Sequence, residues 1–169
     1  YIGGKSMKFE NKIENLYQEI FANANKMIPG EWLKIYIGVD LFIGRGAIYF
    51  FFLTPNDNTL YYSADIPNIY DISEDVYSDL EFELYLKFKN LNNEFSKEKL
   101  IEWNHCEFIV NNDEKYEVIF EFQDDQSNNF DQADRINYFK YKHFGFLPDQ
   151  EYAINNVLEL ESILQKSEN

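Results

Sequence analysis

Residues 116–134 read YEVIFEFQDDQSNNFDQAD and divide into an alternating half and a polar half. In the first half, one set of positions is aromatic or aliphatic and the other carries carboxylates: Tyr116, Val118, Phe120 and Phe122 alternate with Glu117, Ile119 and Glu121. Side chains on a strand point to opposite faces at this period. The first half therefore predicts a strand with a buried aromatic face, and the second half, which has no apolar period, predicts an acidic polar loop.

Four other segments have the length and composition of strands: residues 32–41, 47–53, 60–64 and 103–110. The unbroken apolar run at 47–53 indicates a central strand. Short turns join the first three segments into a predicted meander. The polar loop 111–114 is of the kind that joins a hairpin, so we expect residues 103–110 to pair with residues 116–122.

Apolar residues at three- and four-residue spacings predict four helices, at residues 8–28, 73–95, 133–144 and 152–165. The second is ambiguous, since residues 81–89 also alternate like a strand. Ser73 is a fair helix N-cap, and the segment is longer than most strands, so both features favour a helix. The order α-β-β-β-α-β-β-α-α predicts an α+β fold in which helices pack on a single-layer antiparallel sheet of about five strands.

A chain of 169 residues with 16 Phe and 13 Tyr is long enough and apolar enough for a single folded domain, which we expect at residues 7–169. Residues 1–6 precede Met7 and are typical of a vector remnant. Cys106 is the single cysteine, which excludes an intrachain disulfide. No apolar run approaches the roughly 18 residues of a membrane span, so we expect a cytoplasmic protein without a membrane partner.

The net charge of −15 is concentrated in the middle of the chain. Residues 65–134 hold 19 acidic and 5 basic residues, which gives this stretch a net charge of −14. Such a field repels nucleic acid and accelerates encounter with basic partners. The alternative is a solvated surface that serves solubility alone.

Catalytic patterns are weak in this sequence. Cys106 and His143 would need contact and a third orienting group to act as a nucleophile and its base. We expect instead that Cys106 is a small buried thiol on a strand, with neighbouring His105 on the opposite face.

The acids of the polar loop do not form a recognisable metal site. Asp124, Asp125, Asp131 and Asp134 lack the spacing and the glycine of a calcium loop. Among 30 acids, a pair suited to a glycosidase carries almost no information. We predict no catalytic residue, no metal and no cofactor.

Several short segments, in this order and spacing, resemble a known family: MIPGEW at 27–32, Tyr62 with DIP at 65–67, CEF at 106–108, RINY at 135–138 and YKHFGFLP at 141–148. Their combination is similar to the YezG/EsaG immunity proteins of Gram-positive bacteria, and the match covers nearly the whole chain after Met7. The resemblance implies an antitoxin that protects the producing cell from a polymorphic toxin of the type VII secretion pathway, typically a C-terminal nuclease. In the family a Trp often follows the acid that Asp124 matches, whereas Asp125 follows here, which bears on the toxin variant recognised.

A nuclease holds phosphates in a basic cleft, so concentrated negative charge suits a protein that blocks it. The toxin-binding residues that we predict are acids that steer a basic nuclease domain and aromatic side chains that anchor it: Glu117, Glu121, Asp124, Asp125, Asp131 and Asp134, with Tyr62, Phe130 and Tyr138. Two other functions remain open: a small hydrolase that uses paired carboxylates, and an acidic mimic of DNA that binds host proteins.

Overall fold

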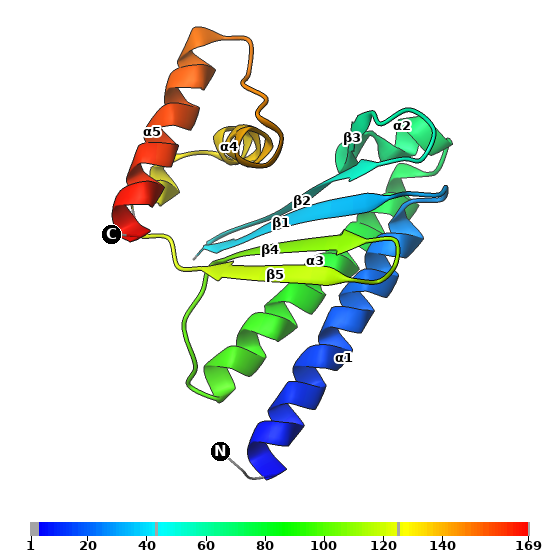
Figure 1. The fold of residues 1–169 in the computed structure, drawn as a ribbon, viewed down its shortest axis with the longest axis vertical. Coiled ribbons are helices and arrows are strands. Elements are labelled where there is room, and N and C mark those ends of the chain that lie inside the picture. Colours follow the sequence, from blue (N-terminus) through cyan, green and yellow to red (C-terminus); the bar gives the residue numbers. More distant parts are fainter. Residues whose placement is uncertain (1–3, 43, 125, 169) are drawn as a thin grey trace. The chain divides into compact units, whose positions relative to one another are not determined.

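Five strands form one antiparallel sheet, and their order across it is β3-β2-β1-β4-β5 (Figure 1). The strands are β1 (Lys34–Phe42), β2 (Arg45–Leu53), β3 (Leu60–Tyr62), β4 (His105–Asn111) and β5 (Tyr116–Glu121). The first three strands form the predicted meander. The chain then crosses over to place β4 on the free side of β1. The predicted α+β class with a five-stranded antiparallel sheet is confirmed.

The structure is a computed structural model that describes residues 4–42, 44–124 and 126–168. The chain divides into two compact units, Tyr1–Phe120 and Glu121–Asn169. The prediction of a single domain over residues 7–169 therefore stays a prediction.

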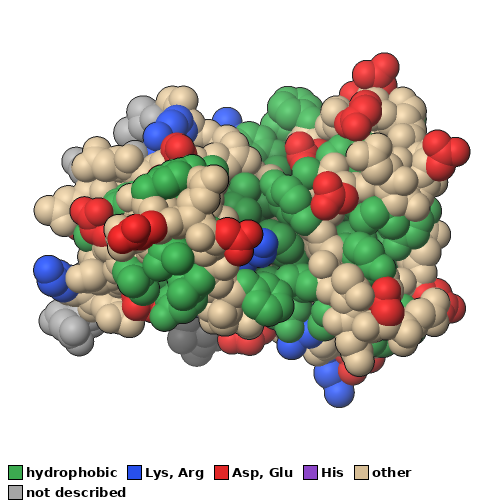
Figure 2. Space-filling view, turned by 90° about the horizontal axis from the view of Figure 1, so that it is seen from above, with side chains coloured by type: hydrophobic (Ala, Val, Ile, Leu, Met, Phe, Trp, Pro, Cys, Tyr) green, Lys and Arg blue, Asp and Glu red, His purple; other side chains and the backbone are tan. Residues whose placement is uncertain are grey.

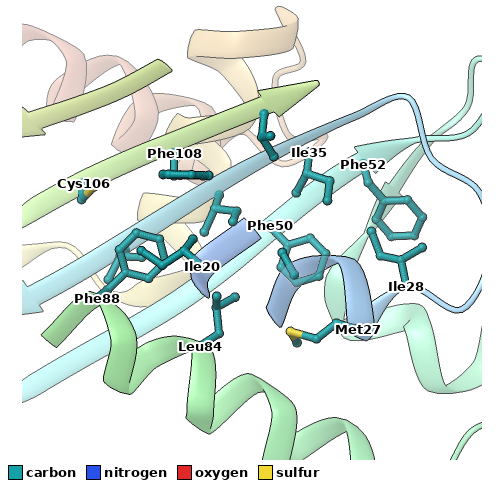
Figure 3. Packing of buried hydrophobic residues seen from close by; sticks show 14 of the residues in the cluster. Ile20, Met27, Ile28, Ile35, Phe50, Phe52, Leu84, Phe88, Cys106 and Phe108 are labelled. Carbon is teal, nitrogen blue, oxygen red and sulfur yellow. The ribbon is translucent and has the colours of Figure 1, made fainter. Parts of the chain in front are cut away.

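In the first unit, α1 (Gly4–Met27) and α3 (Glu74–Lys97) lie side by side along one face of the sheet (Figure 1). Alternate strand residues point toward them. Phe50 and Phe108 are fully buried and face Ile20, Leu84 and Phe88 of the two helices (Figure 3). Burial of one such side chain contributes about 1.5–3 kcal/mol, so this aromatic layer is the main source of stability for the unit.

The helix N-cap at Ser73 is confirmed, since its side chain accepts a hydrogen bond from the Asp75 amide. This cap and the buried Leu84 and Phe88 resolve the ambiguous segment as the helix α3. Before it, the strand predicted at 60–64 ends at Tyr62. A 3-10 turn, η1 (Ser63–Asp65), and the unpredicted short helix α2 (Ile66–Tyr70) follow. Pro67 lies in the first turn of α2, where its fixed φ suits a helix.

One part of the 116–122 prediction is wrong. Phe122 lies beyond the end of β5 and is 60% exposed, whereas we expected it on the buried aromatic face. Tyr116, Val118 and Phe120 do pack against the core as expected. Pairing ends at Glu121 because the polar loop begins there, so period-two alternation alone overextends the strand.

The second unit contains a short 3-10 turn and two helices, η2 (Ser127–Asn129), α4 (Gln132–Phe144) and α5 (Glu151–Glu168). Gly145 ends α4 with φ of 73°, a left-handed conformation that glycine adopts without strain. Phe139 of α4 and Val157 and Leu160 of α5 are among the buried apolar side chains of this unit.

Candidate functional site

A buried arginine organises the acidic loop in the second unit. Arg135 is 6% exposed, its Nη1 donates to the Ser127 carbonyl oxygen at 3.0 Å, and its Nη2 donates to the Gln123 side-chain oxygen. Ser127 and Gln123 are themselves buried. One guanidinium therefore ties two points of the loop, Gln123 and Ser127, to the first turn of α4.

Arg135 and its two partners are not among the toxin-binding residues predicted from the sequence. A signal was present, since Arg135 is the only Lys or Arg between residues 116 and 139. A lone cation on the apolar side of a predicted helix is seldom buried unless it is paired. That argument would have selected Arg135 but not its partners.

The acids of the loop have local structural roles. Asp124 accepts a hydrogen bond from the Gln126 amide at 3.1 Å. Asp131 is the N-cap of α4 and accepts from the Asp134 amide at 2.9 Å. Asp134 in turn accepts from the Asn156 side chain of α5 at 3.1 Å. These bonds hold the carboxylates of Asp124, Asp131 and Asp134 in position.

Two further residues were predicted for this loop, Phe130 and Asp125. Phe130 is 6% exposed, so it belongs to the interior beneath the loop and is not an exposed anchor. Asp125 lies outside the described residues.

Glu121 and Tyr138 are brought together in a groove of about 490 Å³ at the surface of the second unit. Tyr141, Glu161 and Lys142 also line it. Lys142 Nζ lies 3.4 Å from Glu121 Oε1, and the Gln123 side chain donates to Glu121 Oε2 at 3.2 Å. Glu161 makes no ion pair within the residues that the structure describes. The groove thus combines two carboxylates, two phenol rings and one lysine.

The remaining two predicted residues belong to the first unit and are not neighbours. Tyr62 is on β3 and Glu117 is on β5, and these strands are the opposite edges of the sheet. Glu117 is exposed, and Tyr62 is half-buried and stacks on Phe51 with ring centroids 5.1 Å apart. Burial, with the charges of Glu81 and Asp65, raises the pKa of the Tyr62 hydroxyl, so this phenol stays protonated.

A second cluster of charges is buried in the sheet of the first unit. On one side of the ring, His105 Nδ1 lies 2.7 Å from Asp40 Oδ1, and on the other, Nε2 lies 2.9 Å from Glu107 Oε2. All three side chains are at most 5% exposed. The Tyr49 hydroxyl lies 3.4 Å from Asp40 Oδ2, and its ring covers Gly38, where a Cβ would lie 2.4 Å from Tyr49 Cε2.

This Asp40–His105–Glu107 cluster is ionic and structural. Burial by itself lowers the pKa of His105, but the hydrogen bonds to Asp40 and Glu107 outweigh it and raise the pKa to about 9. The imidazole is therefore charged at neutral pH. Both ring nitrogens contact carboxylates, so neither can act as the base for a nucleophile. The geometry of the Asp40–His105–Glu107 cluster therefore does not support a hydrolase.

The other proposed chemistries find little support. Cys106 faces the core, opposite to His105 as predicted, and burial, with the charge of Glu107, raises the pKa of its thiol well above the usual value. A protonated, buried thiol is a poor nucleophile. Within the described ranges, no group of three His, Cys, Asp or Glu side chains could hold a metal ion. Nor does any helix in those ranges have the length and apolar character needed to span a bilayer.

The face seen in Figure 2 shows how the surface carboxylates are spaced. Asp and Glu side chains occur singly or in small groups, and hydrophobic side chains are exposed between them. Within the part of each unit seen on this face, the negative charge does not form one continuous patch. An electrostatic field still sums over separated charges, and the apolar side chains between them offer contact area.

Comparison with known proteins gives one family and three relatives. Residues 13–158 match the family described as YezG-like immunity protein. The chain is 38% identical over 162 residues to type VII secretion system protein EsaG of Staphylococcus aureus, covering 96% of this chain and 99% of that protein. It is 31% identical over 139 residues to immunity protein YezG of Bacillus subtilis, covering 82% and 92%. A Bacillus spizizenii immunity protein YezG is 29% identical over 148 residues, covering 88% and 91%.

Proposed function

The chain belongs to the YezG-like immunity protein family, and on that premise we propose that it neutralises a secreted nuclease toxin by binding it stoichiometrically. The observation that carries the nuclease assignment is the charge distribution, with a net charge of −14 over residues 65–134. A nuclease cleft is basic because it binds phosphates. An acidic protein surface therefore matches it in charge.

The acidic loop of the second unit supports this role because several of its described residues are held by hydrogen bonds within the free protein. Arg135 holds its backbone, and Asp124, Asp131 and Asp134 are fixed by local hydrogen bonds. Binding that orders a flexible loop loses affinity to conformational entropy, and a preformed loop avoids much of that loss. We propose that these acids, with Asp125, Glu117 and Glu121, steer the toxin into its encounter.

The anchors in this proposal are aromatic. Tyr138 lines the groove next to Glu121, and Tyr62 lies half-buried on the edge strand β3 of the first unit. Phe130 supports the loop from beneath. Buried aromatic contacts set the lifetime of most complexes, whereas exposed charges mainly set the association rate. The protein acts by contact and turns over no substrate.

The decisive experiment is co-expression with the toxin encoded next to this gene. We expect growth to be rescued, and we expect the purified protein to inhibit the nuclease linearly up to one equivalent. Rescue without a stable complex, or inhibition at far less than one equivalent, would indicate an enzyme and overturn the proposal.

A charge-matched pair of variants tests the steering step. One variant carries Glu117→Gln, Glu121→Gln, Asp124→Asn and Asp134→Asn. The control carries Glu→Gln at residues 10, 19, 31 and 159, which are exposed acids that remove the same charge. At low salt we expect a larger fall in the association rate for the first variant. Equal rates for the two variants would refute steering by this loop, even if the complex still forms.

A further inference from the structure

The outward side of α3 carries apolar side chains where a helix is expected to be polar. Its buried side holds Tyr77, Leu84, Phe88 and Leu91. Phe82 and Leu86 lie on the opposite side, one turn apart, and are 59% and 40% exposed. Neither contributes to the core, and neither makes a ring contact within the described residues. Core packing therefore does not explain why these positions are apolar.

Carboxylates surround these two side chains. Asp75 and Asp79 precede Phe82 at spacings of seven and three residues, which place them on the same helix face, and Glu83 lies beside it. All three acids are exposed. We name the five residues Asp75, Asp79, Phe82, Glu83 and Leu86 the α3 ridge.

The neighbourhood of the ridge is strongly one-sided in charge. Residues 65–86 contain seven acidic residues and no Lys or Arg. The next cations along the helix are Lys87 and Lys89, of which Lys89 follows Leu86 by one turn. Lys87 Nζ donates to the Asn23 side chain at 2.8 Å, and Lys89 Nζ lies 5.9 Å from the centre of the Tyr85 ring. Within the described residues, none of the three ridge carboxylates makes an ion pair, so their charge is available to a partner.

Exposed apolar side chains next to carboxylates exclude most classes of binding partner for the α3 ridge. A second copy of the chain would bring Asp75, Asp79 and Glu83 against the same acids, because a two-fold interface pairs a patch with itself. Nucleic acids and anionic membranes are repelled by the same charge. A basic protein surface with an apolar pocket matches both the carboxylates and the exposed Phe and Leu.

We propose that the α3 ridge is a docking surface for a basic protein, with Phe82 and Leu86 as the apolar anchors and the three acids as the charged rim. The identity of that partner as the nuclease toxin rests on the proposed function above. The ridge lies in the first unit and is distinct from the loop of the second unit. In this proposal, both units contribute residues to toxin binding.

The test uses a catalytically inactive form of the toxin domain encoded beside this gene. Phe82→Ser with Leu86→Ser should raise the dissociation rate at least tenfold. The matched control is Leu100→Ser with Ile101→Ser, two residues of the same unit with similar exposure, 46% and 65%. The control should change the rate less than twofold. Circular dichroism of each variant checks that the helix content is intact.

The charged rim is tested separately. Asp75→Asn, Asp79→Asn and Glu83→Gln together should slow association at least threefold at low salt. A control with Glu10, Glu19 and Glu31 changed to Gln alters the net charge equally and should slow it less. If the wild-type complex forms and both ridge variants show unchanged association and dissociation rates, the α3 ridge is not a docking surface. The proposed function would stand in that case.

A toxin-independent measurement covers the case in which the wild-type protein fails to bind that domain, which would refute the proposed function. The probe is a synthetic amphipathic helix of lysine and leucine, titrated into the ¹⁵N-labelled protein. Saturable chemical-shift changes confined to residues 75–86, and absent from the Phe82→Ser, Leu86→Ser variant, would support a basic partner. Shifts spread over all acidic surfaces, or none at the ridge, would overturn it.

Discussion

Carboxylates in two parts of the first unit have opposite surroundings. Asp40 and Glu107 are buried in the sheet and share one charged imidazole, whereas Asp75, Asp79 and Glu83 lie on the outer face of α3 in solvent. A buried carboxylate must be compensated locally, or the fold is destabilised. An exposed one is compensated by water, so it is available to a partner. Burial, and not residue type, therefore separates acids that maintain the fold from acids that serve binding.

The largest effect on stability is expected for His105→Leu in the buried cluster. It removes the cation between two buried carboxylates, and breaking a buried ion pair in this way typically destabilises by about 3–5 kcal/mol. We expect a loss of that size in urea unfolding. A triple variant, Asp40→Asn with His105→Leu and Glu107→Gln, removes the charges as well and should recover much of the loss. A cost below about 1 kcal/mol for the single variant would contradict an ionic cluster.

The pH dependence of stability gives a second test of the charge on buried His105. The pKa of His105 is raised from 6.5 to about 9 in the folded state. A group whose pKa is raised in the folded state contributes stability that is fully present below its unfolded-state pKa. This contribution is lost as the pH rises through the folded-state pKa. We therefore expect the free energy of unfolding to fall between about pH 6.5 and pH 9, by up to about 3 kcal/mol.

The measurement is urea unfolding from pH 6 to pH 10 for the wild-type protein and for His105→Gln. Only the difference between the two curves is assigned to His105, since burial of Tyr17 raises the pKa of its hydroxyl to about 12 and tyrosines also titrate in alkali. Parallel curves for both proteins would show that His105 is not charged in the folded state.

Local sequence signals predict some elements of this fold and miss others. Local signals were sufficient for α3, because the Ser73 cap and a buried stripe are both encoded within the helix. Its outer Phe82 and Leu86 fit neither signal. Helix α2 was missed because Pro67 suggests a break, although proline is also compatible with a first helical turn. Phe122 was misplaced because alternation does not encode where strand pairing stops.

The buried cluster could not be predicted because it depends on strand order. Asp40 and His105 are 65 residues apart and meet since β4 pairs with β1, opposite each other in register. The sequence does show that His105 and Glu107 share one face of a strand. It does not show which strand lies beside them. The contacts of Arg135 could not be predicted either, because its two partners lie in an irregular loop.

A smaller effect is expected at the N-terminus of α4. Asp131 caps the helix by accepting the Asp134 amide, and loss of such a cap typically costs about 1 kcal/mol. Asp131→Ala should therefore lower the stability of the second unit by about this amount and increase amide exchange at residues 132–135. Asp131→Asn keeps a capping oxygen and should restore most of it. As a control, Asp149→Ala removes an exposed acid that makes no hydrogen bond in the described residues. If Asp149→Ala were as destabilising as Asp131→Ala, the loss would reflect charge and not capping.

The smallest stability effect is expected on the α3 ridge. Changing Asp75 and Asp79 to Asn and Glu83 to Gln relieves like-charge pairs four residues apart, which stabilises by a few tenths of a kcal/mol. It also removes a favourable charge from the first turn of α3, which costs a similar amount. The two effects oppose each other, so the urea midpoint should move by less than the equivalent of about 0.5 kcal/mol. Neutralising Asp40 and Glu107 while keeping His105 should move it several times further, because the buried imidazole then loses the two carboxylates that hold its proton and the stabilisation of that ion pair. If the ridge variant were instead the more destabilising of the two, its acids would have to be counted among those that maintain the fold, and slower toxin association could no longer be assigned to a lost contact.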